Sequence, residues 1–388
     1  MALKNNTWTL NQWYDQDVSG NVSYIGATEL WVAGDGRMTG ASNNTKYSSP
    51  VQIPGTNWGG PSSIANIKLS TGIGEGFRIW LKSDGTLWGA GAGAAKLGQN
   101  NNTAQSSPKQ VGSGTDWRSL DSSWGLTVAS KTDGTLWAWG ENLYGALGDG
   151  TTTNRSSPKQ IPGTTWGEWV ATSSSSNATF CIKTDGTLWG WGRNAYGSLG
   201  QNSITTPSGS SGISSPVQIP GDWSNPKDMA SKAIIKSDGT LWAWGQGGYG
   251  QLGETSTINR SSPTQIPGTT WSRITRDASV QLGIKTDGTL WAWGRGDQGQ
   301  LGQNSVAHYS SPTQIPGTTW ASVVTDQQAV LASKTDGTLW GWGENTQYGG
   351  SLGQNNRTDY SSPVQLPGTN WREVGAVNSY GMTAYKEL

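Results

Sequence analysis

Short segments of alternating β-favouring residues, separated by glycine-rich turns, recur along almost the whole chain. The clearest is residues 135–139, T-L-W-A-W, a pattern that predicts a strand. The preceding residues 132–134, T-D-G, suit a tight hairpin turn, and Gly140, Gly145 and Gly148 interrupt the chain afterwards. One hairpin cannot bury two indole rings by itself, so the pattern predicts several such units stacked on one another.

Three independent sequence markers each occur seven times, and they set the number of units. The units follow one another about every 50 residues, with only β-type patterns between turns, which indicates the blades of a β-propeller. The leading Trp of the T-L-W-A-W strand is Trp31, Trp88, Trp137, Trp189, Trp242, Trp291 and Trp340. The Pro of an S-S-P-x-Q-[I/V/L] segment is Pro50, Pro108, Pro158, Pro216, Pro263, Pro312 and Pro363. A lone Trp that opens each unit is Trp58, Trp117, Trp166, Trp223, Trp271, Trp320 and Trp371.

Each unit contains four predicted strands, as the unit that opens at Trp117 illustrates. The first strand follows Trp117, the second covers residues 125–130, and the third is the T-L-W-A-W strand. The fourth contains the S-S-P-x-Q-I segment, whose proline suits an edge of a sheet. We therefore predict an all-β fold, a seven-bladed β-propeller of four-stranded antiparallel blades.

The two ends of the chain are incomplete in complementary ways. Residues 29–34 start the first unit with a third-strand pattern, whereas residues 371–388 hold a first and a second strand and then stop. Joined, the ends make one blade and leave no exposed sheet edge. We therefore predict a propeller over residues 28–388, closed by N- and C-terminal strands that share one blade, after an N-terminal arm over residues 1–27. In the alternative interpretation, a tryptophan of the arm fills the first blade instead.

The composition of the chain adds one further observation, an unusually high content of tryptophan. The chain has 24 Trp and only 2 Phe, and 19 of the 24 Trp occupy repeat positions, which argues for a packing role. We expect the leading Trp of the third strand to be largely buried between blades. This expectation covers Trp137, Trp189, Trp242, Trp291 and Trp340.

Charge and hydropathy exclude several classes of partner. The 26 basic and 26 acidic residues balance, so there is no electrostatic footprint for nucleic acid or an anionic membrane. No apolar run approaches transmembrane length, and residues 1–6, M-A-L-K-N-N, do not read as a secretory signal. We therefore expect no membrane insertion, and a cytoplasmic location unless the chain is part of a virion.

The pattern W-x-W-G-x-N-x-x-G-x-L-G, at residues 137–148 and again at 189–200, resembles the regulator-of-chromosome-condensation repeat family. That resemblance covers residues 28–388 and implies a seven-bladed propeller. Members of the family include a nucleotide-exchange factor for a small GTPase and a bacterial inhibitor of β-lactamases. The His-Ser pair usual before the second strand and the basic tail of chromatin-binding members are both absent, so exchange activity is not expected. Residues 3–15 also resemble the openings of repeat propellers encoded by marine bacteriophages.

The sequence offers little catalytic chemistry, and we expect no enzyme, no cofactor and no metal site. Cys181 and His308 are the only residues of their kinds, which excludes a disulfide within the chain and the usual Cys and His metal clusters. Cys181 lies in an apolar run and is expected to be a small buried residue. The recurring Asp of the D-G-T-L-W segments precedes Gly in a tight turn, which favours a structural role.

Two rings of loop residues are the candidates for partner binding. Tyr and Arg are typical anchors of protein interfaces, and Tyr also stacks on sugars. The alternative is that each Tyr packs over a neighbouring blade. The ring after the third strand comprises Tyr144, Tyr196, Tyr249 and Tyr348 with Arg193 and Arg295, and the ring before S-S-P comprises Tyr47, Arg155, Arg260, Tyr309 and Tyr360.

These observations predict a rigid, non-enzymatic propeller used for assembly or recognition, and specifically a phage virion structural or attachment protein in a capsid decoration, tail or fibre. Its partners would be other virion proteins or a receptor or glycan on the host surface. The alternatives are a lectin-like glycan-binding propeller and a bacterial protein-binding inhibitor or scaffold. Trp8 and Trp13 are the candidate anchors to the assembly, because aromatic residues are uncommon in tails that remain free in water.

Overall fold

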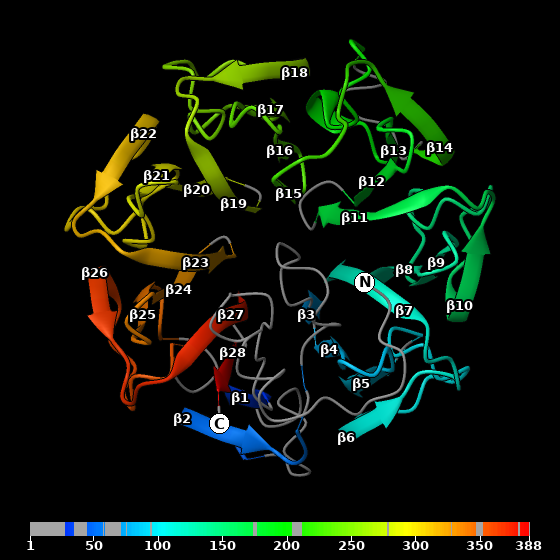
Figure 1. The fold of residues 1–388 in the computed structure, drawn as a ribbon, viewed down its shortest axis with the longest axis horizontal. Coiled ribbons are helices and arrows are strands. Elements are labelled where there is room, and N and C mark those ends of the chain that lie inside the picture. The colour runs from blue at the N-terminus through cyan, green and yellow to red at the C-terminus, as the bar shows by residue number, and fades with distance from the viewer. Residues whose placement is uncertain are drawn as a thin grey trace, which may run out of the picture.

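The computed structural model shows a ring of β-sheets around a central axis (Figure 1). It describes residues 28–34, 45–56, 58, 71–74, 76–93, 95–173, 177–203, 212–277, 279–326, 328–346, 352–378 and 381–387. Six sheets, one of them eight-stranded, divide into seven four-stranded antiparallel blades. The predicted fold class is therefore confirmed. Residues 1–27, the proposed arm, lie outside the described residues.

The strands occur in the same order in every blade, from the centre of the ring outward. Blade 1 comprises β27 (Trp371–Asn378), β28 (Gly381–Glu387), β1 (Thr28–Gly34) and β2 (Tyr47–Ile53). Blade 2 comprises β3 (Thr71–Gly74), β4 (Phe77–Leu81), β5 (Leu87–Gly91) and β6 (Gln105–Gln110). Blade 3 comprises β7 (Trp117–Trp124), β8 (Leu126–Lys131), β9 (Leu136–Gly140) and β10 (Arg155–Ile161). Blade 4 comprises β11 (Trp166–Ser173), β12 (Ala178–Lys183), β13 (Leu188–Gly192) and β14 (Ile213–Ile219), with the short 3-10 helix η1 (Ala195–Gly197) before β14.

The remaining three blades repeat this arrangement. Blade 5 comprises β15 (Asp228–Ala230), β16 (Ala233–Ile235), β17 (Leu241–Gly245) and β18 (Arg260–Ile266). Blade 6 comprises β19 (Trp271–Asp277), β20 (Val280–Lys285), β21 (Leu290–Gly294) and β22 (Tyr309–Ile315). Blade 7 comprises β23 (Trp320–Thr325), β24 (Ala329–Lys334), β25 (Leu339–Gly343) and β26 (Tyr360–Gln365).

Blade 1 closes the ring with strands from both ends of the chain. β1 pairs with β28 over seven residues, from Thr28 opposite Glu387 to Gly34 opposite Gly381. The predicted closure by the C-terminal strands is therefore confirmed, and the first blade needs no strand from residues 1–27. Between blades 2 and 3 the innermost strands β3 and β7 also pair, in parallel, which joins these two blades into the eight-stranded sheet.

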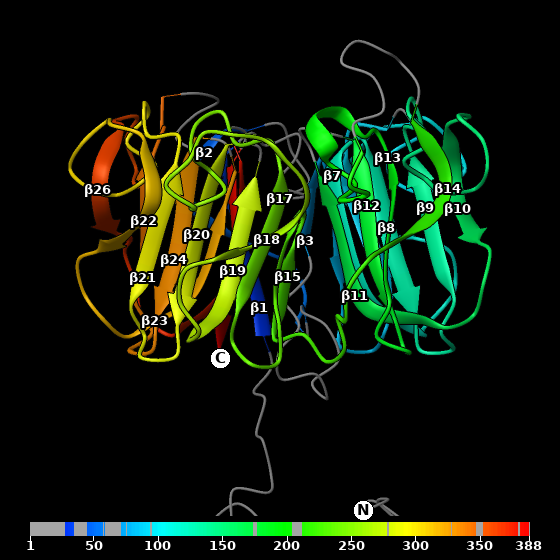
Figure 2. The ribbon, with the colours of Figure 1, turned by 90° about the horizontal axis from the view of Figure 1, so that it is seen from above.

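The two faces of the ring carry different connections (Figure 2). The long loops between the third and fourth strands lie on one face, here called the loop face. The Asp-Gly turns between the second and third strands, and the linkers from one blade to the next, lie on the opposite face, here called the turn face. The fourth strand, with its S-S-P segment, forms the outer edge of each blade, where a residue without an N–H is tolerated (Figure 1).

A relay of hydrogen bonds explains the recurring D-G-T-L-W segment. In blade 3, the Asp133 carboxylate accepts from the backbone N–H of Thr135 at 2.9 Å and from its hydroxyl at 2.6 Å. The Thr135 hydroxyl in turn accepts from the indole N–H of Trp137 at 2.9 Å. Five other blades repeat the relay, through Asp84, Asp185, Asp238, Asp287 and Asp336. The structural role predicted for these carboxylates is thus supported by their contacts.

The leading Trp of each third strand packs against the core between blades, as expected, but a second Trp lies deeper. The leading Trp of the third strand is only half-buried, whereas the second Trp has no exposed surface: this is Trp139, Trp191, Trp244, Trp293 and Trp342. Both rings point toward the preceding blade, because residues two apart lie on the same side of a strand. The leading Trp lies two residues closer to the turn face along the strand, so water reaches the edge of its ring.

Trp244→Ala should destabilise the propeller by about 3–5 kcal/mol, because it leaves a cavity in the core between blades 4 and 5. Trp242→Ala, at the half-buried position of the same strand, should cost about 1–3 kcal/mol. Urea denaturation of both variants measures the difference. Equal losses would show that burial in the interface does not distinguish the two positions.

Acid should weaken the fold through the Asp-Gly turns. Hydrogen bonds from the following Thr lower the pKa of the carboxyl at Asp133, Asp185, Asp238, Asp287 and Asp336. A lowered native pKa stabilises the fold above the unfolded pKa of about 3.9, and that contribution disappears as pH falls through the native values. The urea midpoint should therefore be level from pH 7 to 5 and fall below about pH 4. A variant with all five changed to Asn, which suits the same turn, should show a smaller fall between pH 5 and 3; an identical fall would assign the acid sensitivity elsewhere.

Candidate functional site

The two predicted rings of loop residues meet on the loop face. The last Gly of each third strand pairs with the first residue of the fourth strand, as Gly140 does with Arg155 and Gly294 with Tyr309. This register brings the residues after the third strand and those before S-S-P to the same edge of the blade. The upper edge in Figure 2 shows these loops. Tyr348, Trp8 and Trp13 lie outside the described residues.

A buried asparagine holds each long loop in shape where the W-G-x-N motif is complete. The Asn142 side-chain amide donates to the carbonyls of Thr151 and Thr153 at 3.0 and 3.2 Å, and its oxygen accepts from the backbone N–H of Leu147 at 2.9 Å. Asn194 and Asn345 make the corresponding bonds in blades 4 and 7. The loop backbone is therefore fixed from within, and only the loop tips face solvent.

Two of the predicted arginines are committed to their own loops. The Arg155 guanidinium lies 2.6 Å from the Asp149 carboxylate, and Arg260 lies 2.7 Å from Glu254. Burial opposes ionisation of Asp149, but hydrogen bonds from Thr151 and Arg155 outweigh it and hold the pKa of Asp149 below its usual value. These ion pairs brace the loops, so Arg155 and Arg260 contribute rigidity more directly than they contribute free charge.

The tyrosines of the first ring connect loops of neighbouring blades. The Arg193 guanidinium of blade 4 lies 5.0 Å from the centre of the Tyr144 ring of blade 3. Arg295 of blade 6 lies 5.5 Å from the Tyr249 ring of blade 5 and also bonds to Asp297 at 2.6 Å. Tyr196 and Tyr249 are exposed, at 52% and 39% of the residue surface respectively. Both the interface and the packing interpretations of this ring thus find support.

The second ring lies closer to the core. Tyr309 and Tyr360 are half-buried and pack against the hydrophobic clusters of blades 6 and 7, and the Tyr360 hydroxyl accepts from Asn356 at 2.9 Å. Tyr47 is half-buried at the start of β2. His308, next to Tyr309, accepts the N–H of Gly296 on its Nδ1 atom at 3.1 Å.

Three exposed aliphatic side chains on the loop face were not among the predicted residues. Leu143 is 68% exposed, and Ile258 and Val306 are each 61% exposed. They lie in the long loops of blades 3, 5 and 6, on the same face as Tyr196 and Tyr249. Each stands in a polar loop sequence, and this contrast is the signal that could have identified them.

A second missed feature lies on the turn face, where a lysine lies at or next to the end of each second strand. In blade 4, the Lys183 ammonium lies 4.8 Å from the centre of the Trp166 ring and 4.2 Å from that of Trp189. Such a cation between two indoles occurs in all seven blades. The lysines are Lys82, Lys131, Lys183, Lys236, Lys285, Lys334 and Lys386. In six of the seven units this lysine directly precedes the [T/S]-D-G turn, and its fixed position in the sequence could have identified it.

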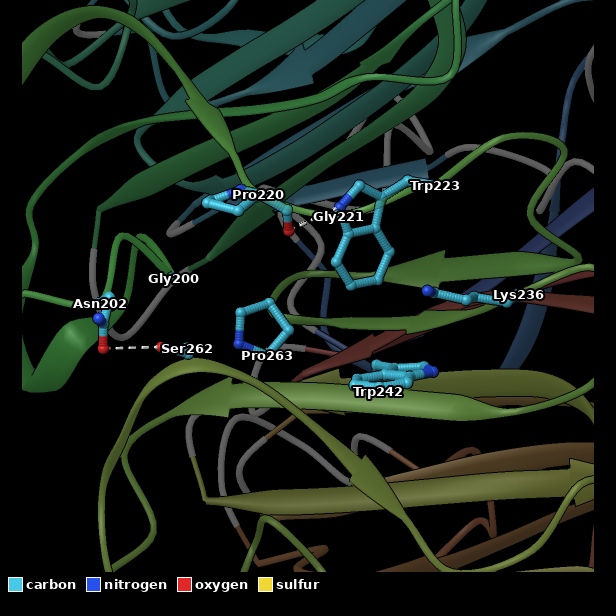
Figure 3. Close-up of a pocket in the computed structure, with 9 residues that line it drawn as sticks. All are labelled: Gly200, Asn202, Pro220, Gly221, Trp223, Lys236, Trp242, Ser262 and Pro263. Atoms are coloured by element: carbon cyan, nitrogen blue, oxygen red, sulfur yellow. Dashed lines mark hydrogen bonds between the residues drawn. The ribbon is translucent and has the colours of Figure 1, made fainter.

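A pocket of about 410 Å³ opens at the seam between blades 4 and 5 (Figure 3). Its residues come from both blades and from the linker between them: Gly200, Asn202, Pro220, Gly221, Trp223, Lys236, Trp242, Ser262 and Pro263. Trp223 and Trp242 meet edge to face, with ring centres 6.4 Å apart. The Lys236 ammonium lies 4.8 and 4.7 Å from those two centres.

Conventional catalytic chemistry is sparse in the described residues. No group of three or more His, Cys, Asp or Glu side chains is placed there to hold a metal ion. Cys181 is fully buried, and burial raises the pKa of its thiol far above the usual range, which makes it a poor nucleophile. No helix in the same residues is long and apolar enough to cross a membrane.

This architecture defines a seven-bladed propeller with a variable loop face and a uniform turn face. More specifically, the description of the regulator of chromosome condensation (RCC1) repeat matches residues 133–182, 185–231, 238–278 and 287–325 of this chain. A second RCC1 repeat description matches residues 169–198. These matches run from β9 of blade 3 to β23 of blade 7.

Curated relatives and solved structures show the same similarity. The ultraviolet-B receptor UVR8 of Arabidopsis thaliana is 25% identical over 242 residues, which cover 61% of this chain and 52% of UVR8. The protein RCC2 homolog of Danio rerio is 34% identical over 129 residues, 32% of this chain and 25% of the relative. The matched part thus spans about half the length of these curated relatives or less.

Two solved structures share the fold. Prp20p from Saccharomyces cerevisiae, a protein with binding properties to Gsp1p and histones, superposes with a TM-score of 0.74 at 17% identity, over 94% of this chain and 92% of its own. Human WBSCR16 gives a TM-score of 0.74 at 17% identity, over 94% and 99% of the two chains. At this level of identity the likeness concerns the fold alone.

Proposed function

We propose that this chain is a non-enzymatic binding propeller whose loop face holds a protein partner, and that it does so as a structural or attachment component of a bacteriophage particle. The observation that carries the first part is the set of exposed apolar side chains Leu143, Ile258 and Val306 on the loop face. Apolar and aromatic residues gathered on one face are typical of interaction surfaces.

The rigidity of the loops supports the same interpretation. Buried Asn142 and the Arg155–Asp149 and Arg260–Glu254 ion pairs fix the loop backbones before any partner arrives. Each loop is also held by the next blade: the N–H of Gly150 donates to Ser214 O at 2.8 Å, and five other seams have an equivalent bond. A preorganised surface loses less conformational entropy on binding.

Proteins with this fold offer precedents for protein partners. Prp20p has been described with Gsp1p and histones, and Kap60 has been solved bound to Prp20. The only cysteine and the only histidine of the present chain both have structural contacts, which favours binding over catalysis. The virion role rests on the resemblance of residues 3–15 to phage-encoded propellers, and a bacterial inhibitor or scaffold is the alternative within the same class.

Changing the apolar tips of the loop face should abolish partner binding and leave the fold intact. In the triple variant Leu143→Ser, Ile258→Ser and Val306→Ser, all three positions are more than half exposed, so the melting temperature should change by less than about 3 °C. The chain should be detected by mass spectrometry in gradient-purified phage particles, and the triple variant should be missing from them.

The matched control changes exposed residues of the turn face, Thr132→Lys, Thr184→Lys and Thr286→Lys. This control should enter particles as the unchanged chain does. Particles without the unchanged chain would refute the virion role. Equal incorporation of both triple variants would refute the role of the loop face.

The N-terminal arm generates a separate prediction. Because blade 1 is completed by β27 and β28, deletion of residues 2–20 should leave a folded propeller with an unchanged urea midpoint. If Trp8 and Trp13 anchor the chain to its assembly, the truncated protein should no longer enter particles. Normal incorporation would remove the anchor role, and unfolding would show that the arm contributes to the propeller.

A further inference from the structure

The pocket between blades 4 and 5 lies where the repeat is altered. The linker from Ile219 to Trp223 has three intervening residues, whereas the other six linkers between an outer strand and the next opening Trp have four or five. Pro220 and Gly221 of this short linker form part of the pocket wall. The innermost strand that follows, β15, has only three residues. The pocket therefore lies where this linker and this strand differ from their counterparts in the other blades.

The lining combines aromatic and apolar surface with hydrogen-bonding groups. Trp242 and Lys236 are half-buried and line the pocket, and Pro220 and Pro263 add apolar surface. At the far end, the Ser262 hydroxyl donates to the Asn202 side-chain oxygen at 3.1 Å (Figure 3). This bond fixes the orientation of the Asn202 side-chain amide. A volume of about 410 Å³ is within the range of small-ligand sites.

We propose that this pocket binds one uncharged sugar unit of a glycan. A pyranose ring has an apolar C–H face that stacks on an aromatic ring, and its hydroxyls both donate and accept hydrogen bonds. Trp242 and Pro263 supply the apolar surface, the Lys236 ammonium donates, and Asn202 and Ser262 donate and accept. This sugar site is separate from the loop face, and its ligand is additional to the protein partner proposed for that face.

The local charge favours a neutral sugar over an acidic one. The pKa values of Asp222 and Asp238 are lowered first by hydrogen bonds from Ser224 and Thr240, and additionally by the charge of Lys236. Two carboxylates thus lie within electrostatic reach of the single ammonium group. An anionic sugar would meet no excess of positive charge here.

The indole N–H groups argue against a proline-rich peptide. Aromatic grooves that hold extended peptides combine stacking with hydrogen bonds to peptide carbonyls. Here the Trp223 N–H donates to Pro220 O at 3.2 Å, and the Trp242 N–H donates to the Thr240 hydroxyl at 2.9 Å. Both donors are used internally, so the partly exposed Trp242 offers ring surface and no free N–H group to a ligand, while Trp223 is buried behind it.

The test uses the full chain and four neutral probes, maltotriose, lactose, mannotriose and tri-N-acetylchitotriose, in saturation-transfer NMR and isothermal titration. At least one should bind with a Kd of about 1 mM or below. Lys236→Met keeps the stem packed on both indoles and should weaken that binding about 10-fold or more, as expected for a lost charge-assisted hydrogen bond. Asn202→Ala, at an exposed position, should also weaken it.

The matched control is Lys285→Met, because Lys285 lies over Trp271 and Trp291 in the same way at the next seam, where the linker has the usual length. It should leave sugar binding unchanged. An equal loss in both lysine variants would place binding at the repeated lysine sites and overturn the proposal. Binding of none of the neutral sugars, or preferential binding of a polyproline peptide or of uronate oligosaccharides offered in parallel, would also overturn it.

Discussion

The ring depends on the contact between the buried second Trp of each W-x-W strand and the long loop of the preceding blade. The indole N–H of Trp191 donates to Ala146 O at 2.9 Å, and that of Trp244 to Ser198 O at 2.9 Å. Trp139 and Trp342 make the same bond to Lys96 and Gln300. The receiving turn needs Gly, since a Cβ at Gly148 would lie 2.6 Å from the Trp191 Nε1 atom. The G-x-L-G turns of blades 3 to 6 are therefore the sockets for the tryptophan of the next blade, and stability arises between neighbours, as in other repeat folds.

The closing seams replace this contact, because blades 1 and 2 carry Ala33 and Ala90 where the second Trp would be. At the seam between blades 7 and 1, Met382 occupies the socket beside Gly353. Between blades 1 and 2 the volume is filled by Trp80 and Tyr385, and the Arg78 guanidinium donates to Met382 O at 2.9 Å. Complete burial lowers the pKa of Arg78 to about 10, so this seam carries a desolvation cost. The seam between blades 5 and 6 carries a similar cost, because burial lowers the pKa of Arg276 to about 9.

The sequence was sufficient for the architecture because each of its signals acts locally. Asp-Gly turns, alternating strands, edge prolines and two half-units at the ends determine the blade count, the strand order and the closure. The features that could not be predicted depend on which residues of neighbouring loops and blades contact each other. A pattern of alternation cannot tell which Trp of W-x-W lies deeper, since both have the same phase along the strand. Likewise, the partners of Arg155 and Arg260, and the position of each Lys between two indoles, become visible only when loops and blades are folded together.

The separation between scaffold and recognition surface follows from the same contacts. Because the Trp sockets and the buried asparagines fix the loop backbones, the side chains at the loop tips carry little of the folding energy. They can therefore differ from blade to blade, as Leu143, Tyr196, Ile258 and Val306 do, while the Lys–Trp–Trp arrangement of the turn face stays the same in all seven. Residues that are the same in every blade are explained by their role in holding the ring together. Binding is then to be sought where the repeat departs from uniformity, at the loop tips and at the seam with the shortened linker.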